Sequence, residues 1–513
     1  MKDFATDPLT IGIIGAGAMG RGIAQLAATA GLTVMLNDVA GTASEAAVEF
    51  IHKMLDRAVE KGRMSSSDAD NSKACITISP DLAGLAGADL VIEAVVEKLE
   101  VKQALFEALQ DIVSEECILA SNTSSLSITA VATACEKQGR VAGCHFFNPV
   151  PLMKLVEVVA GLRTQADVIE QLLALVKRMG HTPVSVNDSP GFLVNHTGRG
   201  LNTEGLRIIF ERICAPHVVD AVVRDCIGLR MGPFELMDLT ALDVTWPVSE
   251  QIYNQYFHDP RLRPTPALRQ RYLAGLLGRK SGAGFYTYVD GKKLVPEEPP
   301  APACRVNARF WVSQAIPDLA GQIVSLLRQA GADLDTGERP QQDTVAMVTP
   351  LGWDTSTACV REHLDPVQTL AVDARFLSDK RICLMTNPAT DSAVIQTAWA
   401  ALAKTGRSVS IIHDSAGFIA QRIVANIVNT ACDIAQQGIA APADIDTGAQ
   451  LGLGYPKGPL ALGDEVGAGV ILDILDHMQE CYQEPRYRPS PWLRRRAQLG
   501  LSLLHPAIHE DCP

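Results

Sequence analysis

His145 is the side chain in this sequence best suited to acid–base chemistry. It lies in Gly-Cys-His-Phe-Phe-Asn-Pro at 143–149, a pattern that predicts a buried strand closed by a proline turn. Imidazole exchanges a proton readily near neutral pH, so a histidine at a strand end could act as a general base. A lone histidine on an apolar strand is, however, more often a structural residue bonded to a main-chain carbonyl.

Ser124 follows another predicted strand and could share a site with His145. Residues 117–120 are apolar and lead into Ser-Asn-Thr-Ser-Ser at 121–125. Such a cluster could simply cap a helix. If the two strands are neighbours, both polar groups emerge at the sheet edge where ligands bind in open α/β folds.

A glycine-rich segment near the start of the chain predicts a dinucleotide site. An apolar strand runs into Gly15, Gly17 and Gly20, spaced as Gly-x-Gly-x-x-Gly and followed by a helical pattern. These glycines permit a tight turn, a close approach by a pyrophosphate and close helix packing, and the helix N-terminus offers amides to the phosphates. A second strand ends at Asp38, whose carboxylate suits ribose hydroxyls and repels a 2′-phosphate. NAD is therefore expected rather than NADP.

Two further segments place charged residues near the expected ligands. A buried strand over 89–95 precedes a predicted helix carrying Glu97 and Lys102, which puts both on the cofactor side of the sheet. A helix expected over 43–61 has one apolar side and a basic face that ends in Lys61. That face is either solvated or in contact with an acidic ligand.

Four motifs in order resemble the 3-hydroxyacyl-CoA dehydrogenase family. They are the glycine loop, the serine-rich cluster, His-Phe-Phe-Asn-Pro at 145–149 and Asp-Ser-Pro-Gly-Phe at 188–192. The similarity covers roughly residues 9 to 290. It implies NAD-dependent oxidation of an (S)-3-hydroxyacyl-CoA to the 3-oxoacyl-CoA, with His145 as the base.

The resemblance also implies roles for other residues. Glu157 matches the glutamate that orients the histidine, while Ser124 and Asn195 match residues that bind the reacting oxygen. Asn195 would begin a helix in a second domain, so that domain closure would complete the site. Lys61 matches a lysine that contacts CoA, whereas the accompanying serine position holds Met54. The implied cofactor-binding residues are Gly15, Gly17, Met19, Gly20, Asp38, Glu97, Lys102 and Asn122.

The second half of the chain repeats the first. Asp-Ser-Pro-Gly-Phe at 188–192 recurs as Asp-Ser-Ala-Gly-Phe at 414–418, and Asp220 corresponds to Asp446, both at a spacing of 226 residues. This repetition predicts a second copy of the helical domain.

The segment between the two copies keeps strand-like runs such as 345–348 and 382–385 but has no Gly-x-Gly-x-x-Gly. Its Thr-Asn-Pro at 386–388 echoes Phe-Asn-Pro at 147–149, an alignment that puts Leu384 at the histidine position. We therefore expect one active site per chain.

The expected architecture is an α/β Rossmann-type domain and an all-α domain, then a degenerate α/β segment and a second all-α copy. The expected boundaries are 1–186 for the NAD-binding domain, 187–295 for the helical domain, 296–405 for linker and degenerate segment, and 406–513 for the second helical copy. Such a duplication makes an intrachain pseudo-dimer natural, with a homo-oligomer, dimer or trimer, as the alternative.

The two-copy layout resembles the long bacterial members of the family, some of which oxidise 3-hydroxyadipyl-CoA in phenylacetate breakdown. A distal carboxylate would need a cation, for which Arg199, Arg261 and Arg263 are candidates. A 3-hydroxybutyryl-CoA or general fatty-acyl substrate remains an alternative. The 2-hydroxyacid dehydrogenases share the glycine loop but lack His-Phe-Phe-Asn-Pro. An NAD-binding structural protein, like the lens crystallins that resemble this family, is a rival of another class.

Composition excludes several other functions. The formal net charge of −13 argues against a nucleic-acid partner, because such binding depends on neutralising phosphates. The 12 cysteines form no Cys-x-x-Cys pair, which favours a reduced, cytoplasmic setting and no metal site. No apolar run approaches the ~20 residues of a membrane span.

Overall fold

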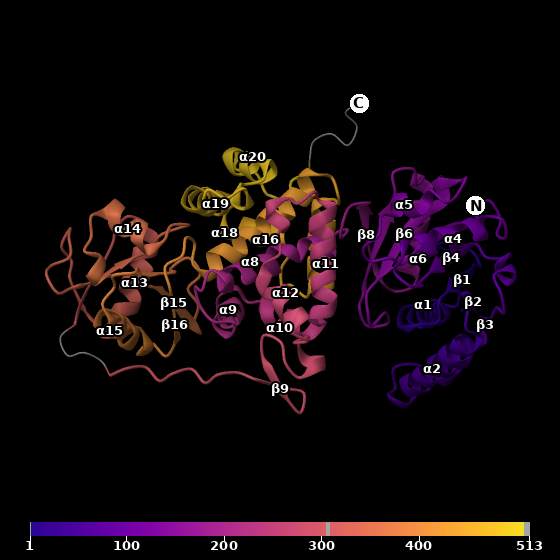
Figure 1. The fold of residues 1–513 in the computed structure, drawn as a ribbon, viewed down its shortest axis with the longest axis horizontal. Helices are drawn as coiled ribbons and strands as arrows, with labels where there is room; N and C mark the ends of the chain where they lie inside the picture. Colours follow the sequence, from indigo (N-terminus) through magenta and orange to yellow (C-terminus); the bar gives the residue numbers. More distant parts are fainter. Residues whose placement is uncertain (1, 304–307, 507–513) are drawn as a thin grey trace. The chain divides into compact units, whose positions relative to one another are not determined.

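The computed structural model describes residues 2–303 and 308–506, which fall into two compact units (Figure 1). The first unit contains the chain up to His196 together with Gln437–Leu453. The second contains Thr197–Gln436 and the chain from Gly454 onward.

The first unit is built on a Rossmann-type sheet with strand order β3-β2-β1-β4-β5-β6-β7-β8. Neighbouring strands are parallel except β6 and β7, which are antiparallel. The central strands are buried apolar runs, as expected for a sheet covered on both faces. The strands are β1 (Thr10–Ile14), β2 (Thr33–Asn37), β3 (Ile76–Ile78), β4 (Leu90–Glu93), β5 (Ile118–Ser121), β6 (Val141–Phe146), β7 (Leu155–Ala160) and β8 (Thr182–Asn187).

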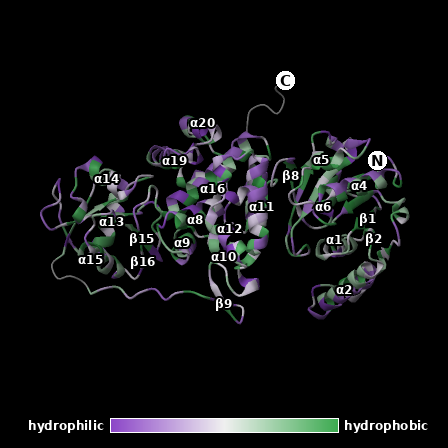
Figure 2. Cartoon of the chain, viewed as in Figure 1, coloured by the Kyte–Doolittle hydropathy of each residue, from purple (hydrophilic) through white to green (hydrophobic). Residues whose placement is uncertain are grey.

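The helices of this sheet follow the predicted patterns closely. Helix α2 buries Ala47, Ile51 and Leu55 at helical spacing, and Figure 2 shows hydrophobic and hydrophilic residues alternating along it. Glu97 precedes α4 instead of lying on it, which corrects the expected helix start. The helices are α1 (Ala18–Thr29), α2 (Gly41–Glu60), α3 (Ser66–Ala74), α4 (Leu99–Gln110), α5 (Ile128–Ala132), α6 (Ala166–Arg178) and α7 (Val194–Thr197).

A helix from the second half of the chain completes the first unit. Helix α17 (Pro442–Leu453) lies against β7 and β8, although by sequence it belongs to the second helical copy. The amide of Asn187, at the end of β8, donates to the carbonyl of Ile439 at 2.8 Å. Its side-chain amide donates to Gly438 O at 2.7 Å. The segment before α17 therefore extends the edge of the first sheet.

The second unit contains most of both helical copies. Within the first copy, Ala241 has a φ of 70° and separates α10 from α11. The first copy has α8 (Arg199–Phe210), α9 (Pro216–Val222), α10 (Pro233–Thr240), α11 (Leu242–Gln255), α12 (Pro266–Leu273), β9 (Thr287–Val289) and β10 (Lys292–Leu294). The second has α16 (Ile419–Gln436), α18 (Pro459–Val466), α19 (Ala468–Tyr482) and α20 (Pro491–Leu499).

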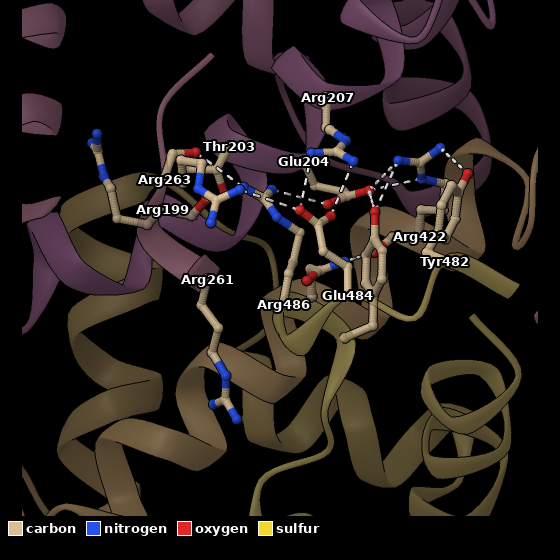
Figure 3. Close-up of polar contacts among 12 residues, drawn as sticks. Arg199, Thr203, Glu204, Arg207, Arg261, Arg263, Arg422, Tyr482, Glu484 and Arg486 are labelled. Carbon is tan, nitrogen blue, oxygen red and sulfur yellow. Dashed lines mark hydrogen bonds and ion pairs between the residues drawn. The ribbon is translucent and has the colours of Figure 1, made fainter. Parts of the chain in front are cut away.

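Helices α8 and α16 pack together around equivalent positions of the repeat. A Cβ on Gly200 would lie 3.0 Å from the carbonyl oxygen of Asn426, which is the residue 226 positions later. A position that meets its own equivalent is typical of two-fold related copies. Next to this crossing, Arg422 Nη2 lies 2.6 Å from Glu204 Oε1, and both side chains are fully buried (Figure 3).

A smaller sheet in the second unit has the order β12-β11-β13-β14-β15-β16, with β14 and β15 antiparallel. The amide of His413 donates to the carbonyl of Ile213 at 3.0 Å, a bond that repeats the one from Asn187 to Ile439. Each helical copy thus contributes a segment to the sheet of the other half. The elements are β11 (Arg309–Val312), α13 (Pro317–Gln329), β12 (Asp333–Leu334), β13 (Val345–Val348), α14 (Thr355–Glu362), β14 (Thr369–Val372), β15 (Arg381–Met385), α15 (Ser392–Ala403) and β16 (Ser408–Ile412).

Over the described ranges, no helix combines the length and hydropathy needed to cross a membrane.

Candidate active site

The glycine loop leaves room for a ligand at one position and is crowded at the other two. Gly15 has a φ of 100°, and a Cβ on Gly20 would lie 1.7 Å from the Gly15 carbonyl oxygen. A Cβ on Gly17 would meet nothing within 4 Å. Gly17 is the N-cap of α1 and offers no side-chain cap, and Met19 lies in the first turn of the helix. The loop therefore fits a dinucleotide pyrophosphate bound at the helix N-terminus.

Asp38 lies beside this loop at the end of β2. Its Oδ2 accepts a hydrogen bond from the amide of Ala16 at 2.7 Å, and its Oδ1 accepts one from Ala40 at 2.9 Å. The carboxylate is thus fixed next to the glycine loop, where the Rossmann fold places the ribose of a dinucleotide.

Glu97 organises the serine-rich loop after β5. Its Oε1 accepts bonds from the hydroxyl of Thr123 at 2.6 Å and from the amides of Ser124 and Ser125 at 2.9 and 3.2 Å. Burial alone would raise the pKa of Glu97, but these donors and the Lys102 ammonium hold it below the ordinary value. The loop is therefore anchored by a carboxylate.

Lys102 is buried beneath that loop. Its Nζ lies 2.5 Å from Glu93 Oε1 and 3.2 Å from Glu97 Oε2, and only 1% of the side chain is exposed. Burial raises the pKa of Glu93, although Lys102 and Ser121 oppose that rise. The structure thus places Lys102 behind Glu97.

His145 and Glu157 face each other across β6 and β7. They are register partners in the antiparallel pair, and His145 Nδ1 lies 2.5 Å from Glu157 Oε2. The other oxygen, Oε1, accepts the amides of Leu193 and Val194 at 2.9 and 2.8 Å. The rings of Phe147 and Phe192 lie beside the imidazole. An imidazole and an immobilised carboxylate therefore form one buried pair.

Asn122, Ser124 and Asn195 lie close to this pair. Asn122 Oδ1 accepts the amide of Phe146 at 2.8 Å, which joins the serine-rich loop to the residue after His145. Asn195 Nδ2 donates to the Ser124 carbonyl at 3.4 Å. Asn195 belongs to the same compact unit as His145, and it lies one residue before the end of that part of the unit.

Lys61 lies at the C-terminal end of α2, on the wall of a separate cavity of about 450 Å³ within the first unit. Met54, at the position where the family has a serine, also lines it. Three arginines surround the same space, with apolar walls from α2 and from the segment after β6. They are Arg21, Arg57 and Arg63.

The three arginines considered for a distal carboxylate lie in the second unit. Arg261 forms an ion pair with Asp433, and Arg263 Nη1 lies 3.5 Å from Glu484 Oε1. Figure 3 shows Arg261 directed away from the cluster around Glu204. Arg199 is buried, which lowers its pKa to about 10. Two of the three candidates are thus already paired with carboxylates of the chain.

The second sheet corrects the expected alignment of its histidine position. Strand β15, which contains Leu384, is antiparallel to its neighbour and pairs with the last strand, as β7 does in the first sheet. Cys383 pairs with Ser410, the equivalent of Val184, and therefore holds the glutamate position. Asp373, whose amide donates to Cys383 O at 3.0 Å, holds the histidine position. Leu384 is one residue away from the equivalent of Glu157.

Sequence reasoning missed several residues that build the first site. Glu93 carried no motif, although a carboxylate at the end of a buried strand is a usable signal. The amides of Leu193 and Val194 have no sequence signature, because every residue except proline carries one. Within the described residues, no three His, Cys, Asp or Glu side chains gather as metal ligands would.

Comparisons with known proteins show which family the chain matches. Residues 10–189 match the NAD binding domain of 3-hydroxyacyl-CoA dehydrogenase, and residues 191–288 and 417–502 both match its C-terminal domain. The chain is 36% identical to a 3-hydroxyadipyl-CoA dehydrogenase of Escherichia coli (strain K12), over 96% of this chain and 98% of that protein.

Other relatives match either half or all of the chain. A probable 3-hydroxybutyryl-CoA dehydrogenase of Bacillus subtilis (strain 168) is 41% identical over 54% of this chain and 96% of its own length. A crystal structure of a 3-hydroxybutyryl-CoA dehydrogenase from Escherichia coli K12 aligns with a TM-score of 0.84 and 35% identity, covering 96% of this chain and 99% of that one. The predicted fold, duplicated helical domain and NAD cofactor are confirmed. The chain belongs to the 3-hydroxyacyl-CoA dehydrogenase family and is an NAD-dependent oxidoreductase.

Proposed function

We propose that His145 removes the hydroxyl proton of an (S)-3-hydroxyacyl-CoA during its oxidation to the 3-oxoacyl-CoA. When bound, NAD accepts the hydride from C3. The observation that carries the proposal is the 2.5 Å contact between His145 Nδ1 and Glu157 Oε2. Because Glu157 accepts a hydrogen bond from Nδ1–H, the neutral ring carries its hydrogen on Nδ1 and its lone pair on Nε2, which we assign to proton transfer.

Glu157 fixes the ring and stabilises the positive charge that the imidazole gains. Its Oε1 accepts the amides of Leu193 and Val194, so the carboxylate has a fixed orientation. A carboxylate held in this way favours one tautomer and stabilises an imidazolium beside it.

Ser124 and Asn195 bind the reacting oxygen in this proposal. The hydroxyl and the side-chain amide can donate hydrogen bonds, and fixed donors stabilise an oxygen that gains negative charge. The 3.4 Å contact from Asn195 Nδ2 to Ser124 O supports their adjacency.

For the cofactor, we assign the pyrophosphate to the loop of Gly15, Gly17 and Gly20 and the ribose to Asp38. Glu97 shapes the serine-rich loop, and Lys102 supports Glu97 from beneath. Met19, in the first turn of α1, and Asn122, whose Oδ1 accepts the amide of Phe146, complete this assignment.

Lys61 is the proposed CoA contact. It lines a cavity with Arg21, Arg57 and Arg63, and several cations around one space suit phosphate groups. Replacing Lys61 by Ala should raise KM for an acyl-CoA while leaving KM unchanged for an acyl-pantetheine, which lacks the CoA phosphates. An equal rise in both would refute phosphate recognition by Lys61.

For the acyl chain we propose 3-hydroxyadipyl-CoA, with 3-hydroxybutyryl-CoA and longer fatty-acyl chains as alternatives. The Escherichia coli relative that is 36% identical over 96% of this chain carries the first name, which supports the adipyl form, and the crystal structure that aligns over 96% of the chain carries the second. A kinetic panel of these 3-hydroxyacyl-CoA substrates, followed by NADH absorbance, tests the proposal. The adipyl form should give the highest kcat/KM; a preference for the butyryl form would replace it.

We also propose that the two halves form an intrachain pseudo-dimer with the four-domain division stated above, acting in the cytoplasm. The reciprocal bonds from Asn187 to Ile439 and from His413 to Ile213 support the pseudo-dimer. Deletion of residues 300–513 should therefore give a dimer or an insoluble chain. A soluble and fully active monomer would refute a necessary role for the second half.

A structural, crystallin-like role without turnover is the rival from another class. The presence of His145, Glu157, Ser124 and Asn195 in one unit argues against it. Undetectable turnover across the panel, with NADH bound, would favour it.

A further inference from the structure

We propose that α17, a helix from the second half of the chain, positions the catalytic pair of the first half through Gly448 and Gly452. The inference deepens the proposed function and rests on the assignment of His145 and Glu157. The second half of the chain would then help to position an active site whose catalytic residues all lie in the first half.

The position of the Glu157 carboxylate depends on the segment after β8. Glu157 is fully buried, and its Oε1 is held by the amides of Leu193 and Val194. This segment is entered through Gly191 and Phe192, with φ values of 78° and 47°. A shift of the segment would therefore move the carboxylate that fixes the imidazole.

Helix α17 closely approaches the two residues that hold Glu157, Leu193 and Val194. A Cβ on Gly448 would lie 2.8 Å from Leu193 Cδ2, and one on Gly452 would lie 2.9 Å from both Cγ atoms of Val194. Leu193 and Val194 are buried against the helix. Only glycine permits this approach without moving a neighbour.

Bonds to strand β8 anchor α17. Asp444, in its first turn, accepts the amide of Ser185 at 3.2 Å. Immediately before the helix, Ala440 pairs with Val186 in an antiparallel bridge. Bonds at the sheet edge thus fix where the glycine face of the helix meets residues 193–194.

The two helical copies differ in the residues at this contact. The positions equivalent to Gly448 and Gly452, 226 residues earlier, hold Val222 and Cys226. The position equivalent to Val194 holds the smaller Ala420. The position equivalent to Leu193 holds Ile419, which is as large. Both glycine positions thus carry side chains in the repeat, so the close approach of a glycine face to residues 193–194 belongs to the catalytic half.

Gly448→Ala in the full-length protein tests the proposal. We expect kcat to fall about tenfold, because small displacements of catalytic groups are costly, while KM for both substrates and the Kd for NADH stay within about twofold. Gly469→Ala is the matched control, since this glycine of α19 faces open space and its change should leave kcat unaltered. A helix that only covers the unit would alter the melting temperature but not kcat.

A volume-conserving double variant supplies the rescue. Gly448→Ala with Leu193→Val adds one methyl group and removes one methylene group at the contact, and kcat should return to within about threefold of wild type. Loss of kcat without rescue, or unaltered kcat in a folded Gly448→Ala protein, would overturn the proposal.

Two further variants keep the test decisive. If Gly448→Ala does not fold, Leu193→Val alone, which opens the same contact, should lower kcat with KM unchanged; wild-type kcat would refute the positioning role. Glu157→Gln separates the hypothesis that His145 and Glu157 are the catalytic pair from the hypothesis that α17 positions this pair. Normal turnover in Glu157→Gln would reject the catalytic pair itself, whereas a loss there without any loss in Gly448→Ala would reject only the role of α17.

Discussion

The ends of the antiparallel strand pairs in the two sheets hold equivalent positions with different chemistry. In the first sheet, His145 and Glu157 are joined by a 2.5 Å hydrogen bond. In the second, Asp373 and Cys383 hold these positions, and Gln421 stands where the first half has Asn195. The duplication therefore kept the strand arrangement and lost the base and its partner.

The second position is closed by its own side chains. Gln421 Nε2 donates to Asp373 Oδ1 at 3.0 Å, and its Oε1 accepts the amide of Gly352 at 2.8 Å. Asp373 is buried, and among the described residues its Oδ2 has no hydrogen-bond partner. A filled, buried site of this kind has no room for a substrate oxygen between the two groups.

Structural devices outside the chemistry are shared by both halves. Asp188 Oδ2 accepts the hydroxyl of Ser127 at 2.7 Å, and Asp414 Oδ2 accepts that of Ser356 at 2.5 Å. Each aspartate accepts bonds at the start of a helix, since Ser127 caps α5 and Ser356 lies in the first turn of α14. The second half thus retains contacts that stabilise the fold, although it lacks the pair of His145 and Glu157.

The largest expected effect comes from His145→Gln. Loss of a general base should reduce kcat by about 10³-fold, and Asp373 in the second half should not replace it. The measurement is NADH formation with saturating substrates, with NADH binding as the check on folding. Near wild-type turnover in a folded variant would show that His145 is not the base and that the first sheet does not differ from the second in this way.

A smaller loss is expected from Glu157→Gln, about 10²-fold in kcat. The amide can still accept the bonds from residues 193 and 194, but it no longer stabilises an imidazolium. Cys383→Ser, the matching change in the second half, should leave kcat unaltered. Equal effects of the two variants would contradict a single working site.

Asp373→Asn should leave turnover unchanged and alter only stability. Burial raises the pKa of Asp373 to about 6 from 3.8, so the folded state holds its proton more tightly than the unfolded state. The free energy of unfolding of the wild type should therefore fall by about 3 kcal/mol as pH rises from below 4 to above 6, and it should stay at the lower value at higher pH.

The variant removes this penalty. Denaturant unfolding at pH 4 and pH 8 should show Asp373→Asn gaining stability over the wild type only at the higher pH. A gain of the same size at both values would contradict the buried acid, and a loss of kcat would assign the second site a role in turnover.

Much of the fold could be predicted from the sequence because its signals are local or repeated. The glycine loop, the apolar strands and the spacing of 226 residues between Asp188 and Asp414 each correspond to an observed element. The alignment through Asn-Pro at 387–388 failed because the dipeptide is short. Applying the repeat spacing to His145 would have led to residue 371, two positions from Asp373.

Other features depend on contacts that a single sequence does not display. The bond from Leu193 to Glu157 uses a main-chain amide, and the contact of Gly448 with Leu193 joins residues far apart in the chain. Neither residue type indicates its partner. Leu351 holds the position equivalent to Ser124, and this equivalence follows only from the strand register.

The central claim is that one chain carries one working dinucleotide site, in its first half. Equilibrium titration with NADH, followed by its fluorescence, tests this most directly. The account predicts one NADH per chain for the wild type and none for Gly17→Val, because a side chain there fills the space left for the pyrophosphate. Two NADH per chain, or one retained by Gly17→Val, would contradict it.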